Sequence, residues 1–339
     1  MSPSQQIQAE SQASGNSPRL ENESVWQEKC RAYEPLEGQP WHSVYNEIIK
    51  DVCESTVLKP DVLEVIYSPL VAQERLETFI DTAQFSFSFW APETLDTAPV
   101  KLMILTEKER DWFEATLTPL LTDPSVMEWF GADAKGVGRC GSVGPQAGCG
   151  AKYPVWETTT GTLVYVNMLG TQRTPDDEYN IDAAHNAVHW YQDSHGYQHW
   201  DDGFLEGQAT LYEIAFHFLY TGHDRKREEG ARMVATRDGA PFSARDDEGA
   251  REHLAYCRQS GPDCHHFFYF GGAMQQEKMI LDFGFDKYKE WNVEMRQVRS
   301  REEYEALFES VYGVELRSWQ NESLATYLVE SFNYYRENR

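Results

Sequence analysis

The chain has little positive charge and no long hydrophobic run. Lysine and arginine together number 30, against 55 aspartate and glutamate residues, which gives a formal net charge of −25. This excess of negative charge repels phosphate backbones and anionic lipid, so we expect no nucleic-acid binding and no attachment to a membrane surface. A membrane span needs roughly 18 uninterrupted apolar residues, and no stretch of the sequence approaches that length. We therefore expect no membrane-spanning helix.

Large apolar side chains are almost missing from residues 1–22, which are rich in serine, glutamine and asparagine. A segment of this kind cannot bury enough surface to order itself, so we expect a disordered tail. The segment also lacks the apolar central region of a secretory signal peptide, so no signal peptide is expected in this chain.

Cysteine is scarce, and its six residues fall into three local couples. The couples are Cys30 with Cys53, Cys140 with Cys149, and Cys257 with Cys264. The last two bracket short loops that contain glycine and proline, where a disulfide stabilises by roughly 2–4 kcal/mol. Disulfides favour an extracytoplasmic location. The alternative is six unrelated buried thiols in a cytoplasmic protein.

Apolar residues make up 41% of the 339 residues and aromatic residues 13%, which is typical of a globular protein. The patterns along the chain predict an α+β fold in consecutive segments. A small mixed α/β part is expected over 23–130, and a long glycine-rich loop over 131–154. A mainly helical domain is expected over 155–339.

Two apolar runs predict buried strands, one at 100–107 (VKLMILTE) and one at 161–169 (GTLVYVNML). The sequence EKERDWFEATLTPLL after the first run predicts a helix, with Thr106 placed to cap it. The second strand is expected at a sheet edge, where it could pair with an extended peptide.

The segment 74–91 has apolar residues at helical spacing, although its second half, FSFSFW, alternates as a strand would. A helix is favoured. Its apolar stripe consists of Leu76, Phe79, Ile80 and Ala83. We expect short helices over 26–55, where apolar residues are sparse, and helices from about residue 180 to the C-terminus. An exposed interruption is expected at 237–250.

Two histidines four residues apart, in AAHNAVHWYQ, indicate a metal site. Positions i and i+4 of a helix differ by about 40° in direction, so His185 and His189 project from one face and can reach one ion. Zinc sites that catalyse reactions have three protein ligands and water. Glu206, in HWDDGFLEGQATLYEIAF, is the candidate for the third ligand on a neighbouring antiparallel helix.

The order of these motifs resembles that of the gluzincin superfamily of zinc metallopeptidases. A strand precedes a His-x-x-x-His helix, and Glu-Gly-x-Ala-x-x-Tyr follows, similar to the third-ligand helix of the aminopeptidase and collagenase-like branches. The resemblance covers about residues 160–335. It implies that His185, His189 and Glu206 bind one zinc ion and that the fold is a metallopeptidase fold. The sequence GGAMQQ (271–276) echoes an aminopeptidase substrate motif, but it lies on the wrong side of the histidine helix and is discounted.

Two features differ from the family pattern. Asn186 stands where the family has the glutamate that acts as general base, and the interval between His189 and Glu206 is a few residues shorter. An amide has no protonation equilibrium near neutral pH, although it can orient a water molecule. Loss of general acid–base help typically lowers a rate by about 10²–10⁴-fold.

Other side chains could supply the missing chemistry. Glu213 and Asp182 are candidates for a replacement base, and each could instead hold a ligand imidazole in its correct tautomer. Tyr212 and His217 are possible transition-state donors, although packing in a helical core explains them equally well.

Two functions remain open at this stage. The first is a zinc metallopeptidase-like hydrolase, with weak or absent activity because of Asn186. The second is a non-catalytic pseudopeptidase that keeps the fold, with or without zinc, and binds a peptide or protein partner.

Overall fold

The computed structural model describes most of the chain. The described residues are 24–95, 99–105, 110–120, 152–157, 163–168, 181–197, 202–236, 246–260, 264 and 267–338. They are mostly helical, with one small sheet, which agrees with the expected α+β class. The expected tail (1–22) and residues 131–151 of the expected loop lie outside them.

The chain divides into two compact units, and the division interleaves the sequence. The first unit contains Leu63–Ile80 and Pro99–Thr174, and the second contains Ser24–Val62, Asp81–Ala98 and Pro175–Arg339. The expected parts were consecutive segments, 23–130 and 155–339, separated by a loop. The first helices belong to the second unit because their aromatic side chains pack into its core.

The first unit contains a four-stranded sheet in the order β1-β2-β4-β3. Its strands are β1 (Leu63–Tyr67), β2 (Val100–Leu105), β3 (Lys152–Glu157) and β4 (Leu163–Met168). β2 pairs in parallel with β1 and β4, whereas β3 pairs antiparallel with β4.

Both expected strands are confirmed as β2 and β4, but two details were wrong. β4 lies between β2 and β3, so it is not a sheet edge and its backbone already has partners on both sides. Residues 152–154, expected in the loop, begin β3. Helix α4 (Arg110–Leu117) and a 3₁₀ turn (Thr118–Leu120) confirm the helix after β2. Thr106, its expected cap, lies outside the described residues.

Helix α3 (Gln73–Trp90) confirms the helix expected over 74–91. All four residues of its expected stripe are buried. The alternating half is helical as well, because the phenylalanines and the serines are all buried there. The Ser86 hydroxyl donates to the Thr82 carbonyl at 2.8 Å, within the same helix, so a buried serine needs no outside partner.

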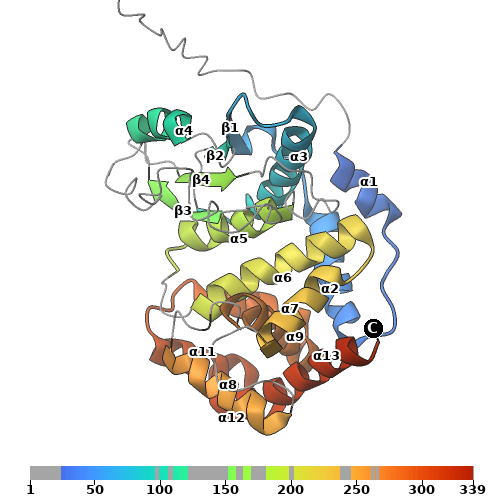
Figure 1. The fold of residues 1–339 in the computed structure, drawn as a ribbon. Coiled ribbons are helices and arrows are strands. Elements are labelled where there is room, and N and C mark those ends of the chain that lie inside the picture. The colour runs from blue at the N-terminus through green and yellow to red at the C-terminus, as the bar shows by residue number, and fades with distance from the viewer. Residues whose placement is uncertain are drawn as a thin grey trace, which may run out of the picture. The chain divides into compact units, whose positions relative to one another are not determined.

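Among the described residues of the second unit, all the regular elements are helices (Figure 1). Its helices besides the end of α3 are α1 (Val25–Ala32), α2 (Pro40–Ser55), α5 (Asp182–Ser194), α6 (Asp202–Thr221), α7 (Arg225–Thr236), α8 (Asp247–Ser260), α9 (Gly272–Phe283), α10 (Phe285–Met295), α11 (Arg301–Tyr312), α12 (Leu316–Trp319) and α13 (Ala325–Glu337). A 3₁₀ turn (Pro60–Val62) and two π-helical segments, Phe267–Gly271 and Gln320–Leu324, complete it.

Two expectations for this unit need correction. α2 has 16 residues and is not a short helix, because one of its faces is buried against the core. α8 begins at Asp247, inside the segment expected as an exposed interruption, and Ala250 is fully buried. Residues 237–245 of that segment lie outside the described residues.

Helix α6 lies at the centre of the helical core. The Trp26 ring of α1 lies 5.0 Å from the Phe216 ring, and the Tyr45 ring of α2 lies 4.6 Å from the Phe218 ring. An ion pair with no exposed surface joins two further helices, since Arg227 Nη2 of α7 lies 2.7 Å from Glu277 Oε2 of α9. A buried pair of this kind is tolerated only with further hydrogen bonds, and Tyr327 supplies one to each partner.

Two of the three cysteine couples form disulfides. Cys30 is bonded to Cys53, and Cys257 to Cys264. The third couple lies outside the described residues. Disulfides are compatible with an extracytoplasmic location. Within the described ranges, no helix combines the length and apolar composition needed to cross a membrane.

Candidate metal centre

The candidate centre lies between α5 and α6, which pack side by side (Figure 1). His185 of α5 contacts Glu213 of α6, whereas Gln192 contacts the earlier residue Leu205. The contacts therefore run in opposite directions along the chain, and the helices are antiparallel, as expected.

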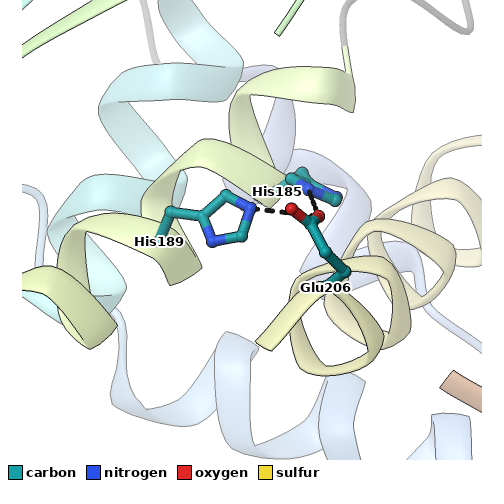
Figure 2. A group of neighbouring side chains, drawn as sticks. All are labelled: His185, His189 and Glu206. Atoms are coloured by element: carbon teal, nitrogen blue, oxygen red, sulfur yellow. Dashed lines mark hydrogen bonds and ion pairs between the residues drawn. The ribbon is translucent and has the colours of Figure 1, made fainter. Parts of the chain in front are cut away.

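The structure brings together the three side chains expected as ligands (Figure 2). His185 Nε2 lies 3.1 Å from Glu206 Oε2, and His189 Nε2 lies 3.3 Å from the same oxygen. One potential ligand atom from each residue lies within 4.8 Å of the other two. The group could therefore hold a metal ion.

The three side chains differ in their exposure to solvent. His185 is only 1% exposed, whereas the side chains of His189 and Glu206 are 20% and 25% exposed. Solvent therefore reaches the group from the side of His189 and Glu206. An ion and a water molecule could enter there.

Glu213 lies on the far side of the His185 ring. Its Oε2 is 2.9 Å from His185 Nδ1, and its Oε1 is 3.1 Å from Lys226 Nζ. A carboxylate accepts hydrogen bonds, so it holds the His185 proton on Nδ1 and leaves Nε2 directed at Glu206. This contact is the one expected if Glu213 holds a ligand imidazole in its tautomer, and both of its oxygens contact groups other than Nε2.

Sequence reasoning missed two partners of the histidines. Gln192 Oε1 lies 2.8 Å from His189 Nδ1, and the spacing of three residues on one helix is a signal that could have found it. The Tyr269 ring stacks on the His185 ring at 5.8 Å between centroids. Tyr269 comes from a distant π-helical segment, which no local pattern predicts.

His189 and Glu206 shift each other's pKa in opposite directions. Burial lowers the pKa of His189, but the negative charge and hydrogen bond of Glu206 outweigh burial, so the pKa is raised. Burial raises the pKa of Glu206, but the two histidines outweigh it and hold the pKa well below its ordinary value. Glu206 is therefore ionised, as a metal ligand must be.

Asn186 follows His185 on α5 and is 2% exposed. Asp182, the other candidate for a replacement base, begins α5 and is 8% exposed. Asp182 does not belong to the group of potential ligand atoms.

The two candidate donors lie away from the ligands. Tyr212 is 3% exposed, and its ring packs 4.9 Å from the Trp90 ring, so core packing accounts for it. His217 lies eleven residues beyond Glu206 on α6, about 16 Å along the axis at ~1.5 Å per residue. This distance places His217 about three turns from Glu206 along the helix.

The glycines of GGAMQQ have a packing role. A Cβ atom on Gly207 of α6 would lie 2.4 Å from the Gly272 carbonyl carbon, and one on Gly272 would lie 2.1 Å from the Gly203 oxygen. The two helices touch here through their backbones, one residue from Glu206. Close helix packing explains this sequence without a substrate.

The donor set fits a divalent metal ion. Two imidazoles present Nε2 to one carboxylate oxygen, and a hydrogen-bond acceptor faces each Nδ1. Two histidines and one carboxylate are a ligand set of catalytic zinc sites, and such acceptors are the usual outer partners of metal-binding histidines.

Comparisons of the chain with protein-family models, with curated proteins and with solved structures gave no match. The resemblance to the gluzincins therefore rests on the sequence motifs alone.

Proposed function

We propose that the protein binds one zinc ion through His185, His189 and Glu206. We further propose that it is a zinc metallopeptidase-like protein with weak or absent peptidase activity. The observation that supports the site is the convergence of His185 Nε2 and His189 Nε2 on Glu206 Oε2, at 3.1 and 3.3 Å. The order of the motifs supports the family.

Asn186 limits the chemistry that this chain can perform. A bound zinc ion would polarise a substrate carbonyl and lower the pKa of water toward about 7. The Asn186 amide can hydrogen-bond a water molecule and orient it, but it can neither take up its proton nor deliver one to a leaving amine. Glu213 does not make up for this, because its two oxygens already face His185 and Lys226.

The alternative is a pseudopeptidase that binds a peptide or protein without cleaving it. The observation that favours it is the amide at position 186. A zinc ion would then help to hold α5 against α6.

Metal analysis tests the site. Purified wild-type protein dialysed against zinc should retain about one equivalent, the occupancy of a single three-ligand site. Glu206→Gln should retain far less, because the change removes the one negative ligand. Absence of zinc from the folded wild type would contradict the proposal.

A pair of variants tests the chemistry. Asn186→Glu adds a carboxylate, whereas Asn186→Gln adds the same length of side chain without one. On an unstructured peptide, Asn186→Glu should gain about 10²–10⁴-fold in rate and lose it on chelation, and Asn186→Gln should gain nothing. A robust wild-type activity that Asn186→Glu lowers would overturn the role given to Asn186. If both folded variants bind zinc and neither gains activity, the non-catalytic alternative is favoured.

A further inference from the structure

Gln192 connects His189 to helix α6 through hydrogen bonds. It lies on α5 and is 2% exposed. Its amide nitrogen donates to the Leu205 carbonyl oxygen at 3.0 Å and to Gln208 Oε1 at 2.9 Å. Its amide oxygen faces His189 Nδ1 at 2.8 Å. All the polar atoms of this side chain therefore have partners.

The Leu205 carbonyl determines which way the amide points. A backbone carbonyl accepts hydrogen bonds and cannot donate them. Turning the amide over would place its oxygen against the Leu205 oxygen and its NH₂ group against His189, so the hydrogen bond to the Leu205 carbonyl would be replaced by a contact between two acceptors. Loss of a buried hydrogen bond in this way costs about 1–3 kcal/mol. The amide oxygen must therefore face His189.

This orientation decides the proton position on the imidazole. An amide oxygen accepts, so His189 Nδ1 must carry a proton to make the 2.8 Å contact. A neutral imidazole has only one N–H. In the neutral imidazole that binds a metal ion, Nε2 then has the lone pair, on the side where Glu206 lies 3.3 Å away.

We infer that Gln192 is a positioning residue of the metal centre, whose amide oxygen holds His189 in the one tautomer that can bind a metal ion through Nε2. This inference rests on the proposed zinc binding. The two histidines have partners of unlike charge. His185 has the carboxylate of Glu213, which Lys226 neutralises, whereas His189 has a neutral amide. The Gln192 amide holds the proton on Nδ1 of His189 and adds no negative charge to that of Glu206.

The chain offers a matched control in Gln276 of α9. Gln276 has no exposed surface, and its amide nitrogen donates to the Phe204 carbonyl at 2.8 Å, one residue before the carbonyl that Gln192 bonds. Its amide oxygen accepts from the Tyr288 hydroxyl. Changing either glutamine to methionine removes a buried hydrogen bond to the same turn of α6, but only Gln192→Met removes a partner of a ligand.

The experiment compares zinc affinity, by competition with a chelator, in wild type, Gln192→Met and Gln276→Met. Removing an outer partner of a metal ligand typically weakens binding by about 10–100-fold, and we expect this loss for Gln192→Met. Gln276→Met should leave the affinity unchanged while losing thermal stability. Equal affinity losses in the two variants, or none in either, would overturn the inference and leave zinc binding itself intact. A wild type that binds no zinc would overturn the proposed function.

A measurement on the wild type covers the case in which the variant does not fold. In the zinc-loaded protein, the Nδ1 proton of His189 should give a slowly exchanging downfield signal in an ¹H–¹⁵N spectrum of the imidazoles. If Nδ1 of His189 carries no proton and Nε2 does, the tautomer is the wrong one and the inference is overturned.

Discussion

Asn186 and Glu213 show how single side chains set the chemistry of the candidate centre. Asn186 occupies the position that the sequence motif gives to a general base, and its amide cannot exchange a proton near neutral pH. Glu213 has the right chemistry but the wrong place, since it contacts His185 at Nδ1. The group could therefore hold an ion, and under the proposed function we expect no general base from Asn186 or Glu213.

His217, which is not one of the proposed metal ligands, gives the fold a dependence on pH. Burial first, and then the positive charges of His223 and Lys226, lower the pKa of His217 to about 4, although Glu213 acts in the opposite direction. An unfolded histidine has a pKa of about 6.5. Between these values the unfolded chain binds a proton that the native protein does not bind. Stability is therefore lost as the pH falls from about 6.5 to about 4, by about 3 kcal/mol in total.

We expect His217→Gln to reduce this acid sensitivity. Urea unfolding of wild type and variant at several pH values from 7 to 4 measures it. The wild type should lose about 3 kcal/mol more than the variant over this range, because glutamine does not titrate. The same decline in both proteins would mean that His217 is protonated in the native state.

The placement of Glu206 depends on the contact between helices α6 and α9. Gly207 and Gly272 allow the two backbones to touch, and a side chain at either position would collide with backbone atoms. Backbone atoms move only if a helix moves. The position of Glu206 therefore depends on its neighbour having no side chain.

Gly207→Ala should separate α6 from α9. The gain in helix propensity is at most about 1 kcal/mol, whereas overpacking of this kind costs about 1–3 kcal/mol. We expect a lower free energy of unfolding and weaker zinc binding, measured by urea unfolding of the metal-free protein and by chelator competition. An unchanged or higher stability would show that the helices absorb the methyl group.

For the molecule as a whole, the net negative charge and the disulfides have opposite effects on the stability of the folded state. A net charge of −25 makes the compact state repel itself. The disulfides Cys30–Cys53 and Cys257–Cys264 oppose unfolding by restricting the unfolded chain. Their effect should depend on how much chain each one closes.

The two disulfides should therefore differ in effect. Cys30 and Cys53 are 23 residues apart in sequence, and Cys257 and Cys264 only 7. Replacing the first pair by serine should lower the free energy of unfolding by about 3.5 kcal/mol, and replacing the second pair by about 2.5 kcal/mol. Urea unfolding without reductant measures both. A larger loss from the shorter loop would show that native contacts, and not loop closure, set the order.

Local patterns predicted the elements because periodicity and β-branched residues act within a few residues of the chain. The strand over 100–105, the helix over 73–90 and the shared face of His185 and His189 all follow from such patterns. Glu206 could be included because seventeen residues after His189 allow one turn and a return helix. The two cysteine couples were also found, from their closeness in sequence.

The sequence by itself thus determined the type of most elements and the three ligand candidates. Only the tertiary structure decided which atoms each of these residues and strands contacts. In the structure, Glu213 contacts Nδ1 of His185, and Gln192 contacts Nδ1 of His189. Strand β4 lies inside the sheet, and the Tyr269 ring stacks on His185. These contacts join elements through packing and hydrogen bonds, which depend on atoms that are distant in sequence, so no local pattern records them.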